Sequence, residues 1–170
     1  MISKNLFLPL LFSALMILSG CQPKGGEPKP LNIEMIAVQS LGGDVPSNTM
    51  WIITPDGTVK RYNFNNHPQY SPSDPLPPDA DEYMKAYTLN ADDWNRMVAA
   101  LEQESFMDFP EKIEYLGVTD VGSTYIQITA DGETHKSGGW AAGWGKDSEN
   151  KRFRRVSQII VGCLNDIRAY

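Results

Sequence analysis

Apolar residues recur at helical spacing in two segments of the chain. The first runs over about 89–105, where Asn90 is a favourable N-cap and two aspartates in the first turn suit the helix dipole. Its apolar positions are Trp94, Met97, Val98 and Leu101. The second runs over about 149–168 and places on one face Phe153, Val156, Ile160, Cys163, Leu164 and Ile167. Both patterns predict amphipathic helices, each with one face to bury.

Two Asp-Gly pairs, Asp56-Gly57 and Asp131-Gly132, lie between runs rich in β-branched and aromatic residues. An Asp-Gly pair in this setting is a strong local signal for a β-hairpin with a tight turn. The pattern therefore predicts two hairpins, and two further apolar runs would supply additional strands. The expected strands lie near 50–55, 58–64, 123–130 and 133–138, with others within 31–40 and 81–89.

These elements predict an α+β domain of two layers, because the helices need a sheet on which to bury their apolar faces. We expect an antiparallel sheet of about five to six strands packed with two amphipathic helices. The segments 52–62 and 127–137 also share a Thr-x-Asp-Gly pattern. Two explanations are open: a duplicated hairpin-helix unit, or two independent hairpins that use the same turn chemistry. Between them, residues 65–80 contain five prolines and predict an extended loop.

The first residues follow a different pattern. Lys4 precedes an apolar run over 6–18, which is shorter than the roughly 18–20 residues that a membrane-spanning helix needs and suits an export signal instead. Leu18-Ser19-Gly20-Cys21 follows, and it resembles the lipobox of bacterial lipoproteins. The resemblance covers only this N-terminal segment. It implies that residues 1–20 are a signal peptide, that Cys21 carries a diacylglycerol, and that the new N-terminus is acylated.

The resemblance also implies a cellular location and a domain organisation. Residues 21–30 would form a lipidated tether of about 30 Å when extended, and 31–170 a single globular domain. The acyl chains on Cys21 would hold the protein to a membrane. Gln22 follows the cysteine where an aspartate would indicate the inner membrane, so analogy with the class favours the outer membrane, facing the periplasm or cell surface. The alternative is an ordinary export signal with a chance cysteine.

Charge and cysteine content narrow the classes of function. The chain has 21 acidic against 15 basic residues, a net charge of −6, which argues against a nucleic-acid partner. The charge is unevenly distributed along the chain. The charged residues of 74–114 are mostly acidic, and those of 136–155 are mostly basic. Cys163 is the second of two cysteines and lies on the apolar face of the second helix, toward its C-terminal end. That position predicts a buried, unreactive thiol without a disulfide partner.

No familiar catalytic or metal-binding motif is present. The segment 139–146 resembles a phosphate-binding loop only superficially, because five residues separate its outer glycines and Asp147 replaces the hydroxyl residue. His67 and His135 lie 68 residues apart, and no zinc, calcium or serine-nucleophile pattern occurs. We therefore predict a protein that is not an enzyme and needs no cofactor or metal. An unrecognised envelope hydrolase is the less favoured alternative.

One stretch, SGGWAAGWGKDSENKRFRR over 137–155, combines glycines with aromatic and basic residues. Tryptophan and arginine are enriched among interface hot spots, and basic residues in a first helical turn oppose the helix dipole. Either the stretch forms a recognition loop, or one indole folds back on the core. The candidate partner-binding residues are Trp140, Trp144, Arg152, Arg154 and Arg155.

We accordingly expect a membrane-anchored envelope lipoprotein whose domain is a non-catalytic binding module. Its partner would be an envelope protein or a cell-wall glycan, and an inhibitor or immunity role is one form of this hypothesis. A structural or assembly factor for an envelope complex is the alternative.

Overall fold

The computed structural model describes residues 30–42, 48–63 and 84–167. The predicted signal peptide, the lipidation site Cys21, nearly all of the tether and the proline-rich segment 65–80 lie outside these residues. Within the described part, neither helix is long and apolar enough to cross a membrane.

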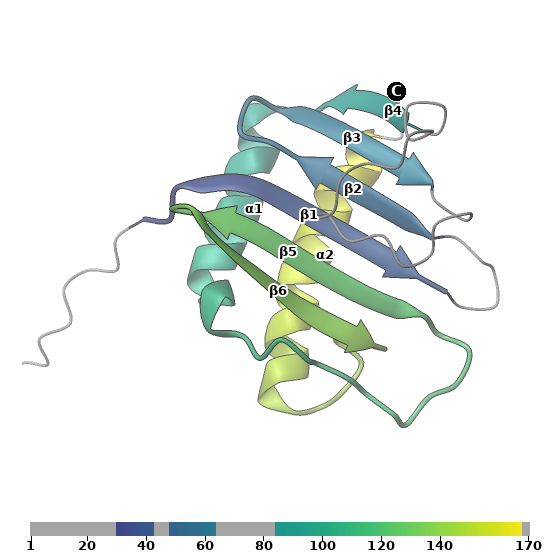
Figure 1. Ribbon diagram of the computed structural model, residues 1–170. Helices are drawn as coiled ribbons and strands as arrows, with labels where there is room; N and C mark the ends of the chain where they lie inside the picture. Colours follow the sequence, from purple (N-terminus) through teal and green to yellow (C-terminus); the bar gives the residue numbers. More distant parts are fainter. Residues whose placement is uncertain (1–29, 43–47, 64–83, 168–170) are drawn as a thin grey trace, which may run out of the picture.

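A six-stranded antiparallel sheet forms one layer of the domain (Figure 1). Its strand order is β4-β3-β2-β1-β5-β6, so the hairpins β2-β3 and β5-β6 flank the central β1. The strands are β1 (Ile33–Leu41), β2 (Thr49–Ile53), β3 (Thr58–Asn63), β4 (Met84–Thr88), β5 (Ser123–Ala130) and β6 (Glu133–Trp140). The predicted strands are thereby confirmed.

Two helices form the second layer and cover one face of the sheet, behind it in Figure 1. They are α1 (Ala91–Gln103) and α2 (Ser148–Ile167), and a short 3-10 turn, η2 (Phe106–Asp108), follows α1. Asn90 caps α1 as expected, because its side-chain Oδ1 accepts a hydrogen bond of 2.8 Å from the Asp93 backbone N–H. The antiparallel α+β architecture predicted from the sequence is confirmed.

The main core lies between the helices and the sheet. Fully buried side chains meet there from both layers: Ile36, Ile53, Val59, Ile126 and Ile128 from the strands, and Met97, Leu101, Phe153, Val156 and Ile160 from the helices. Burying each such side chain contributes about 1.5–3 kcal/mol to folding. The apolar faces recognised by their periodicity are therefore the faces that the fold buries.

The two Asp-Gly turns differ in geometry although they have the same dipeptide sequence. In the β5-β6 turn, Asp131 and Gly132 both have positive φ, 50° and 79°, as a two-residue type I′ loop requires. In the β2-β3 turn only Gly57 has a positive φ, of 81°. The Gly57 N–H bonds to the Thr54 carbonyl at 3.0 Å. This geometry is that of a type I turn followed by a bulge. Moreover, β4 separates the first hairpin from α1, whereas α2 follows β6 directly. These differences favour two independent hairpins over a duplicated unit.

The segment 111–115 runs along the outer edge of the last part of β6. The Ile113 N–H bonds to the Gly138 carbonyl at 3.0 Å, and the Gly138 N–H bonds to the Glu111 carbonyl at 3.1 Å. Gly138 has φ 140°, and a Cβ atom there would lie 2.1 Å from the Thr124 carbonyl oxygen on β5. This glycine is needed for the close approach of three backbone segments, which brings the 115–122 loop beside the end of β6.

Candidate functional site

The connection from β6 to α2, residues 141–147, is called the tryptophan loop below. Its backbone is held by Asn150, a buried residue in the first turn of α2. The Asn150 Oδ1 accepts a hydrogen bond of 2.8 Å from the Gly143 N–H, and its Nδ2 donates to Asp147 Oδ2 at 2.9 Å. The Asn150 backbone N–H also donates to Asp147 Oδ1 at 2.8 Å. This hydrogen bonding lowers the pKa of the Asp147 carboxyl, so the aspartate acts as an ionised cap for α2.

Arg154 holds the same loop from the next turn of α2. Its Nε donates to the Gly143 carbonyl at 2.5 Å, and one terminal nitrogen donates to the Gly145 carbonyl at 2.7 Å. A charged donor to a carbonyl is among the stronger hydrogen bonds in proteins. The tryptophan loop is therefore fixed at several backbone positions, although it contains two glycines.

The two tryptophans of this region have different environments. Trp140, at the end of β6, is half-buried, and its indole Nε1 donates to the Val118 carbonyl at 3.2 Å. Trp144 is 59% exposed although its backbone N–H is bonded to the Ala141 carbonyl. Trp140 thus ties the 115–122 loop to the sheet, while the Trp144 indole points outward from a fixed backbone.

Two hollows meet at Trp144. The first, of about 520 Å³, is lined by Leu116, Gly117, Val118, Thr119, Val121 and Trp144. The second, of about 410 Å³, is lined by Ala142, Gly143, Trp144, Arg154, Ser157 and Gln158. Leu116 is 80% exposed, so of the three exposed large hydrophobic residues in the described part, two flank the first hollow. We call Trp144, Leu116 and the lining of the two hollows the Trp144 surface.

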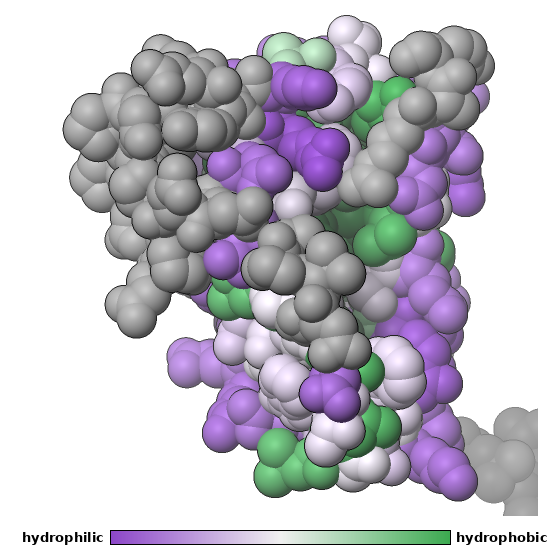
Figure 2. All heavy atoms as spheres, turned by 90° about the vertical axis from the view of Figure 1, so that its right-hand side faces the viewer, coloured by the Kyte–Doolittle hydropathy of each residue, from purple (hydrophilic) through white to green (hydrophobic). Residues whose placement is uncertain are grey.

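Figure 2 views the molecule from the end at the right of Figure 1, the direction in which β6 runs. Hydrophobic and weakly polar residues gather in the lower part of this view, between strongly polar ones on both sides. This part of the surface is of mixed polarity, with hydrophobic residues among weakly polar ones.

The other two candidate arginines, Arg152 and Arg155, also have partners within the domain. Arg155 binds the Glu104 carboxylate through two hydrogen bonds, of 2.5 and 2.8 Å. Arg152 lies 3.8 Å from the same carboxylate, donates to the Glu104 carbonyl, and places its guanidinium 4.4 Å from the centre of the Phe109 ring. Both arginines thus join the start of α2 to the end of α1. Because α2 begins at Ser148, Arg152 and Arg155 lie beyond its first turn, so the expected conflict with the helix dipole does not apply to them.

The Glu104 side chain is only 11% exposed, so its charge depends on these contacts. The hydrogen bond from Arg155 lowers the pKa of the Glu104 carboxyl, the charges of Arg155 and Arg152 act in the same direction, and burial opposes them. The pKa of Arg155 is raised in return, chiefly by its hydrogen bond to Glu104. Both groups are ionised at neutral pH.

The structure therefore divides the five candidate residues. Trp140, Arg152 and Arg155 make internal contacts, Arg154 both holds the tryptophan loop and lines the second hollow, and Trp144 is exposed. Leu116 was not among the candidates. Its signal in the sequence is a large apolar residue directly before a glycine, in a segment between predicted elements where nothing local requires it.

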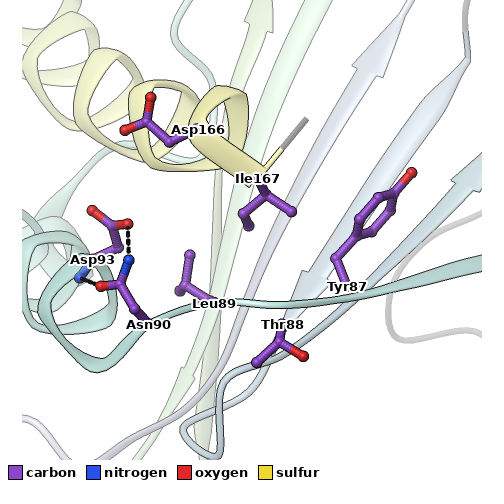
Figure 3. A pocket seen from close by; sticks show the side chains of 7 residues that line it. All are labelled: Tyr87, Thr88, Leu89, Asn90, Asp93, Asp166 and Ile167. Carbon is purple, nitrogen blue, oxygen red and sulfur yellow. Dashed lines mark hydrogen bonds between the residues drawn. The ribbon is translucent and has the colours of Figure 1, made fainter. Parts of the chain in front are cut away.

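A larger hollow, of about 730 Å³, lies at the other end of α2 and is lined by Tyr87, Thr88, Leu89, Asn90, Asp93, Asp166 and Ile167. In Figure 3 the side chains of Leu89 and Ile167 are directed toward one another, and Asn90 and Asp93 are joined by hydrogen bonds. Asp93 also pairs with Arg96 at 2.8 Å. Its best-buried polar groups thus serve the cap of α1 and do not converge on a ligand.

Cys163 is fully buried, as its place on the apolar face of α2 predicted. Burial, with the nearby Asp93 charge, raises the pKa of the Cys163 thiol to about 11, which keeps it protonated at neutral pH. Among the described residues, no group of three His, Cys, Asp or Glu side chains is placed to hold a metal ion.

Comparison with known proteins identifies no family for this chain. A scan against protein-family models matches none of them, and a search of curated proteins finds none that is significantly similar. The Trp144 surface and the N-terminal motif are therefore the features of this protein that bear on its function.

Proposed function

We propose that this protein is an envelope lipoprotein whose domain is a non-catalytic binding module, and that it binds its partner through the Trp144 surface. The observation that carries the proposal is an exposed indole beside an exposed leucine, on a loop whose backbone is fixed by Asn150 and Arg154. The contact of Trp140 with Val118 ties the 115–122 loop to the sheet, and Arg152 and Arg155 join the start of α2 to the end of α1.

The physical argument concerns the cost of ordering. A flexible loop must lose conformational entropy when it binds, whereas a loop already held by hydrogen bonds loses little. A tryptophan presents a large apolar area on only two rotatable bonds, which is why it is frequent among hot spots. The hydrogen bonds that hold the tryptophan loop involve its backbone and Asp147, so folding does not require an exposed indole at position 144.

Binding would be tested by affinity capture from detergent-solubilised envelopes with the full-length chain. We expect wild type to retain a reproducible partner, and Trp144→Ala and Leu116→Ala each to lose it. Val161→Ala is the matched control, because Val161 is also an exposed hydrophobic residue, 42% exposed on α2, but lines neither hollow. Equal capture by all four proteins would show that the Trp144 surface is not the binding site.

The anchor is a separate part of the proposal. We propose that Cys21 is lipidated and holds the domain at the outer membrane, facing the periplasm. The support is the lipobox-like Leu18-Ser19-Gly20-Cys21 after a short apolar run. Labelled palmitate should be incorporated into wild type and not into Cys21→Ser, with Cys163→Ser as the control that keeps its label. An unlabelled wild-type chain would contradict the anchor and leave the binding surface untouched.

A further inference from the structure

Three neighbouring strands carry a row of large side chains on the face of the sheet that the helices cover. The register pairs Trp51 of β2 with Arg61 of β3, and Arg61 with Lys85 of β4, so the three side chains lie side by side on one face. Trp51 belongs to the core between helices and sheet. β4 is the outermost strand, at the top of Figure 1. The row therefore leads from the core to the edge of the sheet.

The Arg61 guanidinium is held over the Trp51 indole. Its central carbon lies 5.2 Å from the centroid of that ring. The Trp51 ring is packed in turn against Tyr87, with the two ring centroids 5.9 Å apart. Because Trp51 is buried, it provides a fixed support. A guanidinium stacked on a fixed aromatic ring keeps its planar set of donors in one orientation, so it loses little freedom when it binds an acceptor.

Neither Arg61 nor Lys85 has an acidic partner among the described residues. The Arg61 Nε is buried without a hydrogen bond, and no ion pair joins either residue to a described carboxylate. Several other basic side chains do have carboxylate partners, in the pairs Arg96–Asp93, Lys112–Glu114 and Arg155–Glu104. Two facing cations without a counter-charge are unexpected in a chain with 21 acidic and 15 basic residues.

This arrangement is unfavourable without an anion. Like charges directly opposite one another on neighbouring strands repel, and a partly buried guanidinium loses hydration that no acceptor replaces. The terminal nitrogens of Arg61 are not among the buried atoms that lack a partner, so they are open to a ligand. Lys85 is exposed on the same face. An anion bound between the two side chains would give the guanidinium an acceptor and remove the repulsion.

We propose that Arg61 and Lys85 bind a phosphate group, with the Arg61 terminal nitrogens donating to phosphate oxygens and the Lys85 ammonium adding a second positive charge. The planar fork of an arginine matches phosphate oxygens, and lysine binds phosphate as a point charge. Two cations suit a phosphate, which carries up to two negative charges, better than a singly charged carboxylate. The site lies at the β4 edge of the sheet, whereas the Trp144 surface follows β6 at the other edge. It is therefore independent of the binding function proposed above.

The same group can reach this site as free phosphate or as the headgroup of a phospholipid, and the test separates the two sources. Isothermal titration calorimetry is carried out on the full-length chain in an uncharged detergent, and the same titration into detergent alone is subtracted. The probes are inorganic phosphate and dioctanoyl phosphatidic acid. Dioctanoylglycerol is the phosphate-free match of the lipid, and sodium acetate is the carboxylate control.

We expect wild type to bind phosphate. Arg61→Gln should weaken binding about tenfold or more, because it removes charged hydrogen bonds. Lys85→Gln should weaken it about fivefold, because a positive charge close to the anion is lost. The matched control is Lys60→Gln, which removes an exposed lysine next to Arg61 on the opposite face of the sheet and should leave binding unchanged. Trp144→Ala should also leave it unchanged, because it alters the other surface.

The outcomes are distinguishable. Lys85 is exposed on the edge strand, so Lys85→Gln tests the site even where Arg61→Gln does not fold. An affinity at least about tenfold higher for phosphatidic acid than for inorganic phosphate assigns a phospholipid headgroup, and a smaller difference assigns free phosphate. The inference is wrong if wild type binds neither phosphate probe, if Arg61→Gln and Lys85→Gln both bind normally, or if Lys60→Gln loses as much affinity as they do. It is also wrong if acetate or dioctanoylglycerol binds as tightly as its phosphate-bearing counterpart.

Discussion

The two ends of α2 place polar and apolar groups in opposite ways. At the C-terminal end, Cys163 and Leu164 are buried and Asp166 is exposed, which is the usual order in a water-soluble domain. At the N-terminal end, the buried Asn150 and the well-covered Glu104 carboxylate lie inside, while Trp144 lies outside. The difference shows that the exposed indole is not a consequence of poor packing, because the residues around it are closely paired.

The comparison also shows which features of the N-terminal end belong to the fold. Asn150, Arg154 and Glu104 hold backbone and charge in place, and each has identified partners. Trp144 and Leu116 contribute exposed apolar area instead. If this division is correct, replacing residues of the first group should lower stability, and replacing those of the second should lower binding alone.

Asn150→Ala should have the largest effect on stability. It leaves the buried Gly143 N–H without its acceptor and removes the side-chain donor to Asp147, whose carboxylate keeps only the backbone N–H of residue 150. We expect a loss of about 2–3 kcal/mol in the free energy of unfolding, measured by urea denaturation. Gln158→Ala, which removes an exposed amide from the same helix, should stay within about 0.5 kcal/mol of wild type. Equal losses in both variants would mean that Asn150 does not hold the loop.

Glu104→Gln should have the next largest effect, about 1–2 kcal/mol at neutral pH, because it removes a charge shared by two partly exposed arginines. The folded-state pKa of Glu104 is lowered, so its stabilisation is present above the ordinary glutamate pKa and is lost as the pH falls through the folded value. The gap between wild type and variant should therefore narrow from about pH 7 to about pH 3. Urea denaturation across this range measures it. Glu133→Gln, at an exposed carboxylate on β6, is the control that should show no such gap.

Trp140→Phe tests the internal indole. It keeps an aromatic ring at the end of β6 but removes the Nε1 donor to the Val118 carbonyl, at a cost of about 1 kcal/mol. Trp144→Phe is the matched variant, because no hydrogen bond of its indole Nε1 is found among the described residues, and its thermal midpoint should match wild type. Identical midpoints for both variants would remove the distinction drawn between the two tryptophans.

Trp144→Ala should have the smallest effect on stability and the largest on binding. Replacing a side chain that is mostly exposed usually changes the free energy of unfolding by about 0.5 kcal/mol or less, and Trp144 is 59% exposed. The same substitution should abolish capture of the partner. A loss of stability above about 1 kcal/mol would assign Trp144 to the fold, and the comparison between the two ends of α2 would then fail.

The sequence by itself determined the secondary structure and the class of fold. Helix periodicity, the Asn90 cap and the two Asp-Gly pairs act over a few residues, so their effects can be read without knowledge of the rest of the chain. Local chemistry also specified that Cys163 would be buried. Local sequence was less informative where the same two residues adopt two turn geometries, as at Asp56-Gly57 and Asp131-Gly132.

Only the tertiary structure decided which residues of the 137–155 stretch are exposed. Trp140 is half-buried and bonded to Val118, 22 residues away, and the exposed Arg155 is held to the domain by the carboxylate of Glu104, 51 residues away. Leu116 joins Trp144 because segment 111–115 pairs with the edge of β6. Contacts between residues so distant in sequence depend on how whole helices and strands pack, and they cannot be predicted from local sequence spacing.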